Sequence, residues 1–298
     1  MNLVTIIVPV YNGESKISNM IESLLKQSYQ NLEILIVNDG SQDNTEKICQ
    51  KFMKNDKRVR ILSKDNGGVS SARNLGLENS RGDVICFADV DDEVESRWID
   101  AMLTAMEKNR AELVICGYEK FNSNLNEKIK IGENGLWNRE EALEACFDTL
   151  GGFLWNKMFK KEIIQEYNIR FHTSVHECED LMFVCEYLMY SRKIVSISNI
   201  LYKYDVSGGN KRSKEKQKSR LVAIEYLIEL LRKNNCTLKY IEELVAEYIV
   251  KGNIYGVSFN KKQVEFTFIQ GIKSLLLSKH YTLKEKIYHL YLFGRRYI

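Results

Sequence analysis

Hydrophobic residues in the first 121 positions form short runs that alternate with helical patterns. Between the first two runs, apolar side chains keep the spacing of one helix face, at Ile17, Met20, Ile21, Leu24 and Leu25. The runs themselves are rich in Ile, Leu and Val without polar alternation, which is typical of a parallel sheet covered on both faces. We predict strands at Leu3–Val10, Leu32–Asp39, Val59–Leu62, Asp83–Asp89 and Glu112–Phe121. The pattern therefore predicts an α/β fold with a doubly wound, mostly parallel sheet.

The pattern changes beyond residue 122. Short strands are expected at Lys193–Ile197 and Leu201–Asp205, after helices at Asn138–Leu150 and Glu179–Tyr190. From about residue 213 onward only helical spacing remains, at Leu221–Arg232, Leu238–Val250, Val264–Leu277 and Leu283–Phe293. The turn Ser207-Gly208-Gly209-Asn210 separates the two regions. We therefore expect a sheet domain over residues 1–210 and a helical C-terminal region over residues 211–298.

Composition narrows the class of protein. A hydrophobic content of 44% is enough for a buried core, and a net charge of +3 argues against a dedicated nucleic-acid binder. The seven cysteines include no C-x-x-C pair and several lie in apolar runs, which suits a reducing compartment without disulfides or a zinc cluster. The chain enters a strand-like run at once, and no apolar stretch is long enough to span a membrane. We expect a cytoplasmic protein.

The most informative stretch is an apolar strand that ends in three acids, Val84-Ile85-Cys86-Phe87-Ala88-Asp89-Val90-Asp91-Asp92. Neighbouring carboxylates repel, so a fold brings them together where a cation shares the site. Hard cations such as Mg²⁺ and Mn²⁺ take oxygen ligands, and ligands bind at the carboxyl ends of strands in open α/β sheets. One interpretation is thus a divalent-metal site. The other is a polar turn in which an Asp caps the next helix.

Two other strand ends carry candidate binding residues. Pro9, the only proline in the chain, lies in Val8-Pro9-Val10-Tyr11-Asn12. It either terminates the strand or forms a rigid wall of a base pocket beside the ring of Tyr11. The second strand ends at Asp39, whose carboxylate could accept a hydrogen bond from a nucleobase N–H or cap the following helix.

A glycine-rich loop follows the third strand, in Asn66-Gly67-Gly68-Val69-Ser70-Ser71-Ala72-Arg73-Asn74. Its glycines allow the backbone to approach a ligand, and the helix N-terminus after them favours anions. Arg73 adds a planar guanidinium suited to phosphate or carboxylate. The loop fits neither G-x-G-x-x-G nor a Walker A sequence, so dinucleotide-binding and P-loop functions are disfavoured.

Taken in chain order, at residues 8–12, 37–41, 66–74 and 89–92, the four motifs resemble those of the family 2 glycosyltransferases, which are inverting enzymes of the GT-A fold. The resemblance implies that Pro9, Val10 and Tyr11 line the nucleobase pocket, and that Asp39 holds uracil N3–H. It also implies that Asn66, Arg73, Asp89 and Val90 contact the nucleotide. Asp91, aided by Asp89, would bind Mn²⁺ or Mg²⁺ as the D-x-D motif. The chain departs from the common form of the family at Ala88 and Val90 and lacks its proline beyond the last aspartate, but keeps every carboxylate.

Two segments further on resemble the branch of this family that acts in capsule and lipopolysaccharide synthesis. They are Phe153–Phe159, similar to its W-N-K segment, and His176–Phe183, similar to its E-D-x-x-F segment. By that resemblance Asp180 is the catalytic base, with Glu179 as the second choice. A carboxylate there could take the proton of an acceptor hydroxyl, and repulsion within the acidic cluster should raise at least one pKa. The alternative is an acidic helix N-terminus favoured by the helix dipole.

The resemblance implies a metal-dependent inverting glycosyltransferase that moves a sugar from a UDP-sugar to a glycan or lipid-linked acceptor in surface polysaccharide synthesis. Two alternatives are a nucleotide-sugar-binding scaffold without catalysis and a sugar-nucleotidyltransferase. The second lacks its glycine-rich N-terminal signature here.

The C-terminal region has two further features. Residues 211–220 contain six basic residues and one acid, and the last twenty residues mix basic and aromatic side chains. Such a region suits peripheral contact with an anionic membrane at the inner face of the bacterial plasma membrane, but also a solvated helix face. Gln217-Lys218-Ser219-Arg220-Leu221 is similar to a Q-x-x-R-W motif of processive members. We attribute this similarity to chance because Leu221 replaces the tryptophan.

Overall fold

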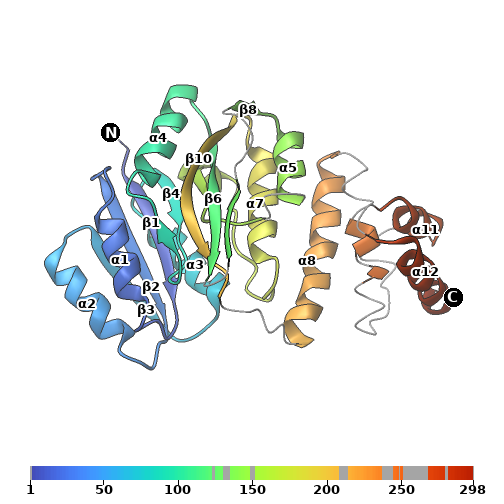
Figure 1. Ribbon diagram of the computed structural model, residues 1–298, viewed down its shortest axis with the longest axis horizontal. Helices are drawn as coiled ribbons and strands as arrows, with labels where there is room; N and C mark the ends of the chain where they lie inside the picture. The colour runs from blue at the N-terminus through green and yellow to red at the C-terminus, as the bar shows by residue number, and fades with distance from the viewer. Residues whose placement is uncertain are drawn as a thin grey trace. The chain divides into compact units, whose positions relative to one another are not determined.

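The structure of the protein is a computed structural model that describes residues 2–122, 125–129, 135–147, 152–207, 214–236, 244–247, 249–250, 268–278 and 281–297. Strands and helices alternate through most of its length (Figure 1). The strands are β1 (Val4–Val10), β2 (Leu32–Asp39), β3 (Val59–Lys64), β4 (Val84–Phe87), β5 (Glu93–Val94), β6 (Leu113–Asn122), β7 (Leu125–Ile129), β8 (Gly135–Trp137), β9 (Lys157–Lys160) and β10 (Ile194–Asp205). The helices are α1 (Ile17–Leu25), α2 (Thr45–Asn55), α3 (Val69–Asn79), α4 (Trp98–Asn109), α5 (Arg139–Phe147), α6 (Lys161–Glu166), α7 (Glu179–Tyr190), α8 (Lys214–Lys233), α11 (Phe268–Leu277) and α12 (Leu283–Tyr297).

The described strands form one sheet in the order β3-β2-β1-β4-β9-β6-β10-β5, with β7 beside β6 and β8 beside β10. Strands β1 to β4 are parallel to one another, and β10 is parallel to β6. Between the two groups β9 runs antiparallel to both β4 and β6. Because β9 is antiparallel to both of its neighbours, β4 and β6 point the same way, and β4, β6 and β10 all end at the same edge of the sheet as β1 and β2.

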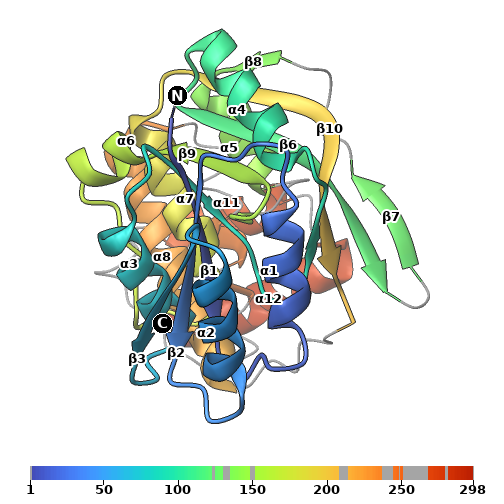
Figure 2. The ribbon, with the colours of Figure 1, turned by 90° about the vertical axis from the view of Figure 1, so that its left-hand side faces the viewer.

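The apolar runs form the buried centre of this sheet. Every residue of β1 and β2 is buried, and α1 buries Ile17, Met20, Ile21 and Leu24 against it. Helices α1 and α2 cover one face and α3 lies on the other (Figures 1 and 2). The prediction of a doubly wound, mostly parallel α/β sheet is therefore confirmed.

Two predictions in the middle of the chain are corrected. The strands expected at Lys193–Ile197 and Leu201–Asp205 are one strand, β10, with register shifts between Ile197 and Tyr202. Ser198 and Asn199 in this irregular part are residue types that are common in turns, and the sequence therefore predicted two strands in place of one. Strand β9 was not predicted because a lysine stands at each of its ends. The structure nevertheless buries Lys157, whose Nζ donates to the carbonyl of Phe153 at 2.6 Å.

The chain divides into two compact units. The first comprises residues 1–173 and 187–210, and the second comprises residues 174–186 and 211–298. Of the predicted boundary turn, residues 208–210 lie outside the described residues, as do 148–150, 264–267 and most of 238–250 from the predicted helices. In the described part of the chain, no helix combines the length and the apolar character needed to cross a membrane.

Candidate active site at the carboxyl edge of the sheet

Parallel strand register brings four of the predicted motifs to one edge of the sheet, here called the carboxyl edge. Val10 pairs with Asn38, and Asp39 pairs with Lys64 at the end of β3. Ile7 pairs with Phe87, so the acids that follow β4 extend beyond the same edge. Ligands bind at this edge in open α/β sheets.

The loops after β1 and β2 are joined by side-chain hydrogen bonds. The backbone N–H of Asn12 donates to Ser41 Oγ at 2.9 Å, and the N–H of Gln42 donates to Asn12 Oδ1 at 2.8 Å. Asn12 adopts a left-handed conformation, with φ of 50°. Pro9 and Val10 are buried within β1, whereas the side chain of Tyr11 is half exposed. Of these three predicted pocket residues, Tyr11 is therefore the one whose side chain is accessible to a ligand.

Asp39 is buried beneath the glycine-rich loop. Its carboxylate accepts hydrogen bonds from Lys64 Nζ at 2.7 Å, from the N–H of Gly67 at 3.0 Å and from the N–H of Gly68 at 2.8 Å. Asn66 Nδ2 donates to the Asp39 carbonyl at 3.0 Å. Asp39 thus does not cap α2 but joins β2 to the loop before α3. A carboxylate offers about four lone-pair sites, so one more donor can be accepted.

Gly40 explains why the two strand ends can approach so closely. Its φ of +76° lies in the left-handed region, and a Cβ added there would lie 2.7 Å from the backbone nitrogen of Asn66. Only glycine fits without displacing the loop.

Arg73 lies on α3 and points to the acidic residues after β4. Its side chain is 5% exposed, and its Nη2 is 3.3 Å from Asp89 Oδ1. The guanidinium lies over the ring of Phe171, 5.5 Å from the centroid. Asn74 exchanges two hydrogen bonds with the backbone of Phe171, at 2.8 and 2.9 Å, which fixes the ring beneath Arg73. The arginine is thus held rigidly beside the acids, as a phosphate-binding residue would be.

We call Asp89–Asp92 the acidic turn, and β10 supports it. Tyr202 Oη accepts the N–H of Asp89 at 3.1 Å and donates to Asp92 Oδ2 at 2.8 Å. Asp92 Oδ1 accepts the N–H of Asp205 at 2.9 Å. Burial first, and then the charge of Asp89, raises the pKa of Asp92 to about 8. Both carboxylate oxygens of Asp92 already accept hydrogen bonds from β10, which leaves Asp89 and Asp91 as the candidate ligands.

Asp91 is the exposed member of the turn. Its side chain is 42% exposed, and Lys16 Nζ lies 3.7 Å from its Oδ2. The same ammonium lies 3.8 Å from Asp205 Oδ2. Lys64, Lys16, Tyr202 and Asp205 were not predicted as site residues. Only Asp205 carried a signal, as an acid at the end of an expected strand.

The donor set fits a divalent cation that is shared with a substrate. Asp89 and Asp91 supply hard oxygen atoms at the carboxyl edge, as Mg²⁺ and Mn²⁺ prefer. Within the described residues, no group of three or more acids, histidines or cysteines is arranged to hold a metal ion. A cation here would need further ligands, and Mg²⁺ is commonly bound by one or two carboxylates together with substrate phosphates.

The W-N-K-like segment packs its aromatic rings against Tyr202. Trp155 stacks on Tyr202 with centroids 4.6 Å apart, and on Phe153 with centroids 4.8 Å apart. Asn156 and Lys157 are fully buried, with Lys157 Nζ 2.9 Å from Asn156 Oδ1. The segment therefore packs against Tyr202, and through Tyr202 it supports the acidic turn.

The second unit contains both candidates for the catalytic base. Asp180 and Glu179 lie in the first turn of α7. Just before them, Glu177 Oε1 pairs with Arg220 Nη1 at 3.1 Å, and the N–H of His176 donates to Ser219 Oγ at 3.1 Å. Helix α8 thus fixes the chain that leads to Asp180.

Arg220 also pairs with Glu247, at 2.6 Å from Nη2 to Oε1. The similarity around Arg220, which we attributed to chance, therefore lies on a residue with a defined structural role. A signal was present, because Arg220 continues the buried stripe Ile224, Leu227 and Leu231 of α8 at helical spacing.

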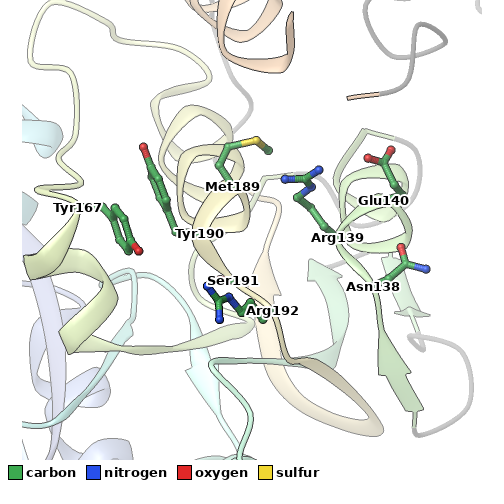
Figure 3. Close-up of a pocket in the computed structure, with 8 residues that line it drawn as sticks. All are labelled: Asn138, Arg139, Glu140, Tyr167, Met189, Tyr190, Ser191 and Arg192. Atoms are coloured by element: carbon green, nitrogen blue, oxygen red, sulfur yellow. The ribbon is translucent and has the colours of Figure 1, made fainter. Parts of the chain in front are cut away.

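The first unit also contains a cavity of about 700 Å³ at the opposite edge of the sheet (Figure 3). It is lined by Asn138, Arg139, Glu140, Tyr167, Met189, Tyr190, Ser191 and Arg192. Ser191 and Arg192 precede the first residue of β10, which pairs with Trp137 of β8. The cavity is therefore separate from the carboxyl edge.

The sequence matches the model of a protein family described as glycosyl transferase family 2 over residues 5–168. The uncharacterized glycosyltransferase EpsJ of Bacillus subtilis (strain 168) is 32% identical over 208 residues, which are 68% of this chain and 60% of that protein. The chain thus spans about three fifths of the length of this relative.

Two solved structures share the fold. S. aureus TarS 1-349 in complex with UDP-GlcNAc has a TM-score of 0.72 at 16% identity and covers 99% of this chain and 91% of its own. The mannosyltransferase PcManGT from Pyrobaculum calidifontis, in complex with GDP-Man and Mn²⁺, has a TM-score of 0.55 at 14% identity and covers 96% of this chain and 78% of its own. These likenesses confirm the predicted GT-A arrangement.

Proposed function

Because the chain belongs to glycosyl transferase family 2 and is thus a glycosyltransferase, we propose that it transfers a sugar from a UDP-sugar to a glycan or lipid-linked hydroxyl, with a divalent cation and with inversion. The observation that carries this proposal is the convergence of Asp39, Arg73 and the acidic turn at the carboxyl edge. TarS, which has the same fold, binds UDP-GlcNAc.

Asp39 and Tyr11 bind the nucleoside. The Asp39 carboxylate keeps a free lone pair after accepting three hydrogen bonds, and it takes uracil N3–H there. The exposed ring of Tyr11 offers a stacking surface for the base. Asn66 holds the loop over Asp39, so the pocket forms only when β2 and the loop before α3 are in register.

Arg73 and the acidic turn bind the diphosphate. Asp89 and Asp91 would hold Mn²⁺ or Mg²⁺, which neutralises charge on the leaving UDP when it is bound. Arg73 supplies a second, fixed positive charge beside Asp89. A rigid guanidinium costs no reorganisation as negative charge develops on the leaving group.

Asp180 is the general base. The acceptor oxygen loses its proton to the Asp180 carboxylate as it forms a bond to the anomeric carbon, and the bond from that carbon to the UDP oxygen breaks. A single displacement of this kind inverts the anomeric centre, so an α-linked donor gives a β-linked product. The similarity of residues 153–159 and 176–183 to the capsule and lipopolysaccharide branch supports a surface-polysaccharide acceptor.

Release of UDP from a panel of nucleotide sugars, in Mn²⁺ and in chelator, tests the donor and the metal. One UDP-sugar should be turned over in Mn²⁺, and Asp91→Asn should abolish this turnover. Equal turnover in chelator would remove the metal from the proposal. Binding of a UDP-sugar without turnover, with any acceptor supplied, would favour a nucleotide-sugar-binding scaffold.

Asp180→Asn tests the base separately. The variant should lose transfer while keeping its affinity for UDP, because Asp180 acts on the acceptor alone. Glu179→Gln is the matched control, since it removes the neighbouring charge in the same turn of α7. If Asp180→Asn retains transfer and Glu179→Gln loses it, the base is Glu179.

A further inference from the structure

A lysine lies between one carboxylate of the candidate metal site and a second carboxylate at the end of β10. Lys16 Nζ is 3.7 Å from Asp91 Oδ2 and 3.8 Å from Asp205 Oδ2. The two acids come from distant parts of the chain, the acidic turn and the last residue of β10. Lys16 precedes α1, in a loop that packs on the turn: a Cβ at Gly13 would lie 3.4 Å from Val90 Cγ2.

The surroundings of Asp205 favour its ionised form. Its backbone N–H donates to Asp92 Oδ1 at 2.9 Å, and its own Oδ1 accepts the N–H of Ser207 at 2.8 Å. Hydrogen bonds from Ser207, and then the charge of Lys16, hold the pKa of Asp205 below its usual range. Its Oδ2 faces the ammonium, and its side chain is only 15% exposed, against 42% for Asp91.

A divalent cation on Asp91 and an ammonium within 4 Å of the same carboxylate repel each other. Lys16 must therefore leave Asp91 when the cation binds, and Asp205 already lies within its reach. We propose that Lys16 is a built-in counter-cation of the acidic turn, which pairs with Asp91 in the metal-free protein and passes to Asp205 when a divalent cation takes Asp91. This inference rests on the proposed function, which places the cation at Asp91.

The test is the affinity for Mn²⁺, measured from the electron paramagnetic resonance signal of the free ion, first without nucleotide and then with UDP. Lys16→Met should bind Mn²⁺ about two- to fivefold more tightly, the range expected for removing one competing exposed ion pair. The matched control is Lys26→Met, which removes the same charge from the end of α1, where Lys26 pairs with Glu22. An unchanged affinity in Lys16→Met, or an equal gain in both variants, would overturn the proposal.

The role of Asp205 as the second partner of Lys16 is tested by a double-mutant cycle. Asp205→Asn should weaken Mn²⁺ binding, because Lys16 then has only Asp91 to pair with, and this effect should shrink in the Lys16→Met background. An equal loss in both backgrounds would mean that Asp205 acts on the metal directly, and would overturn the exchange. Asp91→Asn distinguishes a failure of the proposed metal site from a failure of the proposed Lys16 exchange. If it binds Mn²⁺ like the wild type, the proposed metal site itself is wrong.

Discussion

Asp39 is the residue at which donor binding can be tested most directly. Its carboxylate accepts Lys64 Nζ and two backbone N–H groups of the glycine-rich loop. Asp39→Asn removes the charge and turns an amide NH₂ toward one of these donors. We expect affinity for UDP to fall about ten- to a hundredfold, because a hydrogen bond to a charged group contributes about 1.5–3 kcal/mol.

Calorimetric titration with UDP and with uridine checks this prediction. Both ligands should weaken by a similar factor, because Asp39 acts on the base and not on the diphosphate. Asp65→Asn is the matched control, since it removes an exposed carboxylate from the same loop. Wild-type affinity in a folded Asp39→Asn variant would show that the base binds elsewhere.

A substitution at Tyr202 tests whether its hydroxyl supports the acidic turn. Tyr202→Phe keeps the ring that packs on Trp98 and Trp155 but removes the hydroxyl between Asp89 and Asp92. We expect a loss of about 1 to 3 kcal/mol in the free energy of unfolding, because buried polar groups lose a partner. Affinity for UDP in Mn²⁺ should also fall about tenfold, as when the supports of metal ligands are removed.

The control for Tyr202 is a tyrosine of the same kind away from the site. Tyr187 is also buried, and its hydroxyl donates to the Glu112 carbonyl at 2.8 Å and accepts the N–H of Lys160 at 3.0 Å. Tyr187→Phe should lose comparable stability by denaturant unfolding and leave the UDP affinity unchanged. Equal loss of affinity in both variants would mean that stability alone explains the effect.

The residues that could be predicted are those that stand at strand ends. Asp39 and Asp89 follow apolar runs, and parallel strands bring such positions to one edge. Tyr202 and Asp205 act on residues 113 positions earlier in the chain. Their contacts depend on how β10 is placed in the sheet, for which a single sequence carries no local signal.

At the level of elements, α8 fixes the segment that carries the proposed base. Arg220 pairs with Glu177 at 3.1 Å and with Glu247 at 2.6 Å, and its side chain is 24% exposed. Arg220→Gln leaves two carboxylates of like charge without their cation. We expect a loss of about 1 to 3 kcal/mol in the free energy of unfolding, since removing one member of a partly buried ion pair leaves the other charges without a partner.

Denaturant unfolding followed by the helical circular dichroism signal measures this loss. Lys218→Gln is the matched control, because it removes the same charge from an exposed position of the same helix. Arg220→Lys should recover part of the stability, since it restores the charge without the fork. Equal stability of Arg220→Gln and Lys218→Gln would contradict a structural role for these ion pairs.

The sheet contains strands that the sequence predicts and strands, such as β9, that it does not. Strands β1 and β2 are buried throughout and mostly apolar, and they were predicted to within one residue. Strand β9 has four residues, two of them lysines, and its place between β4 and β6 depends on tertiary contacts. Lys157 is buried because Phe153 and Asn156 supply oxygen atoms for its ammonium, a compensation that hydropathy alone does not reveal.

At the scale of the molecule, the second unit presents apolar side chains to solvent. Leu276, Leu277, Leu283, Ile287 and Tyr288 of α11 and α12 are 48–70% exposed, and Lys284 is exposed among them. Exposed apolar residues beside lysines favour the surface of an anionic membrane, where a lysine contributes about 1 kcal/mol. We therefore expect the protein to bind vesicles that contain anionic lipid and to bind neutral vesicles weakly.

Flotation with vesicles of each kind, at low and high salt, tests this expectation. Leu283→Asp/Ile287→Asp should reduce the fraction bound to anionic vesicles by about tenfold, because it removes apolar area and adds negative charge. Leu136→Asp is the matched control, since Leu136 is 67% exposed in the first unit. Binding that survives Leu283→Asp/Ile287→Asp, or that Leu136→Asp reduces equally, would assign α12 to a solvated surface. An acceptor anchored in a membrane would then have to reach the enzyme by its glycan alone.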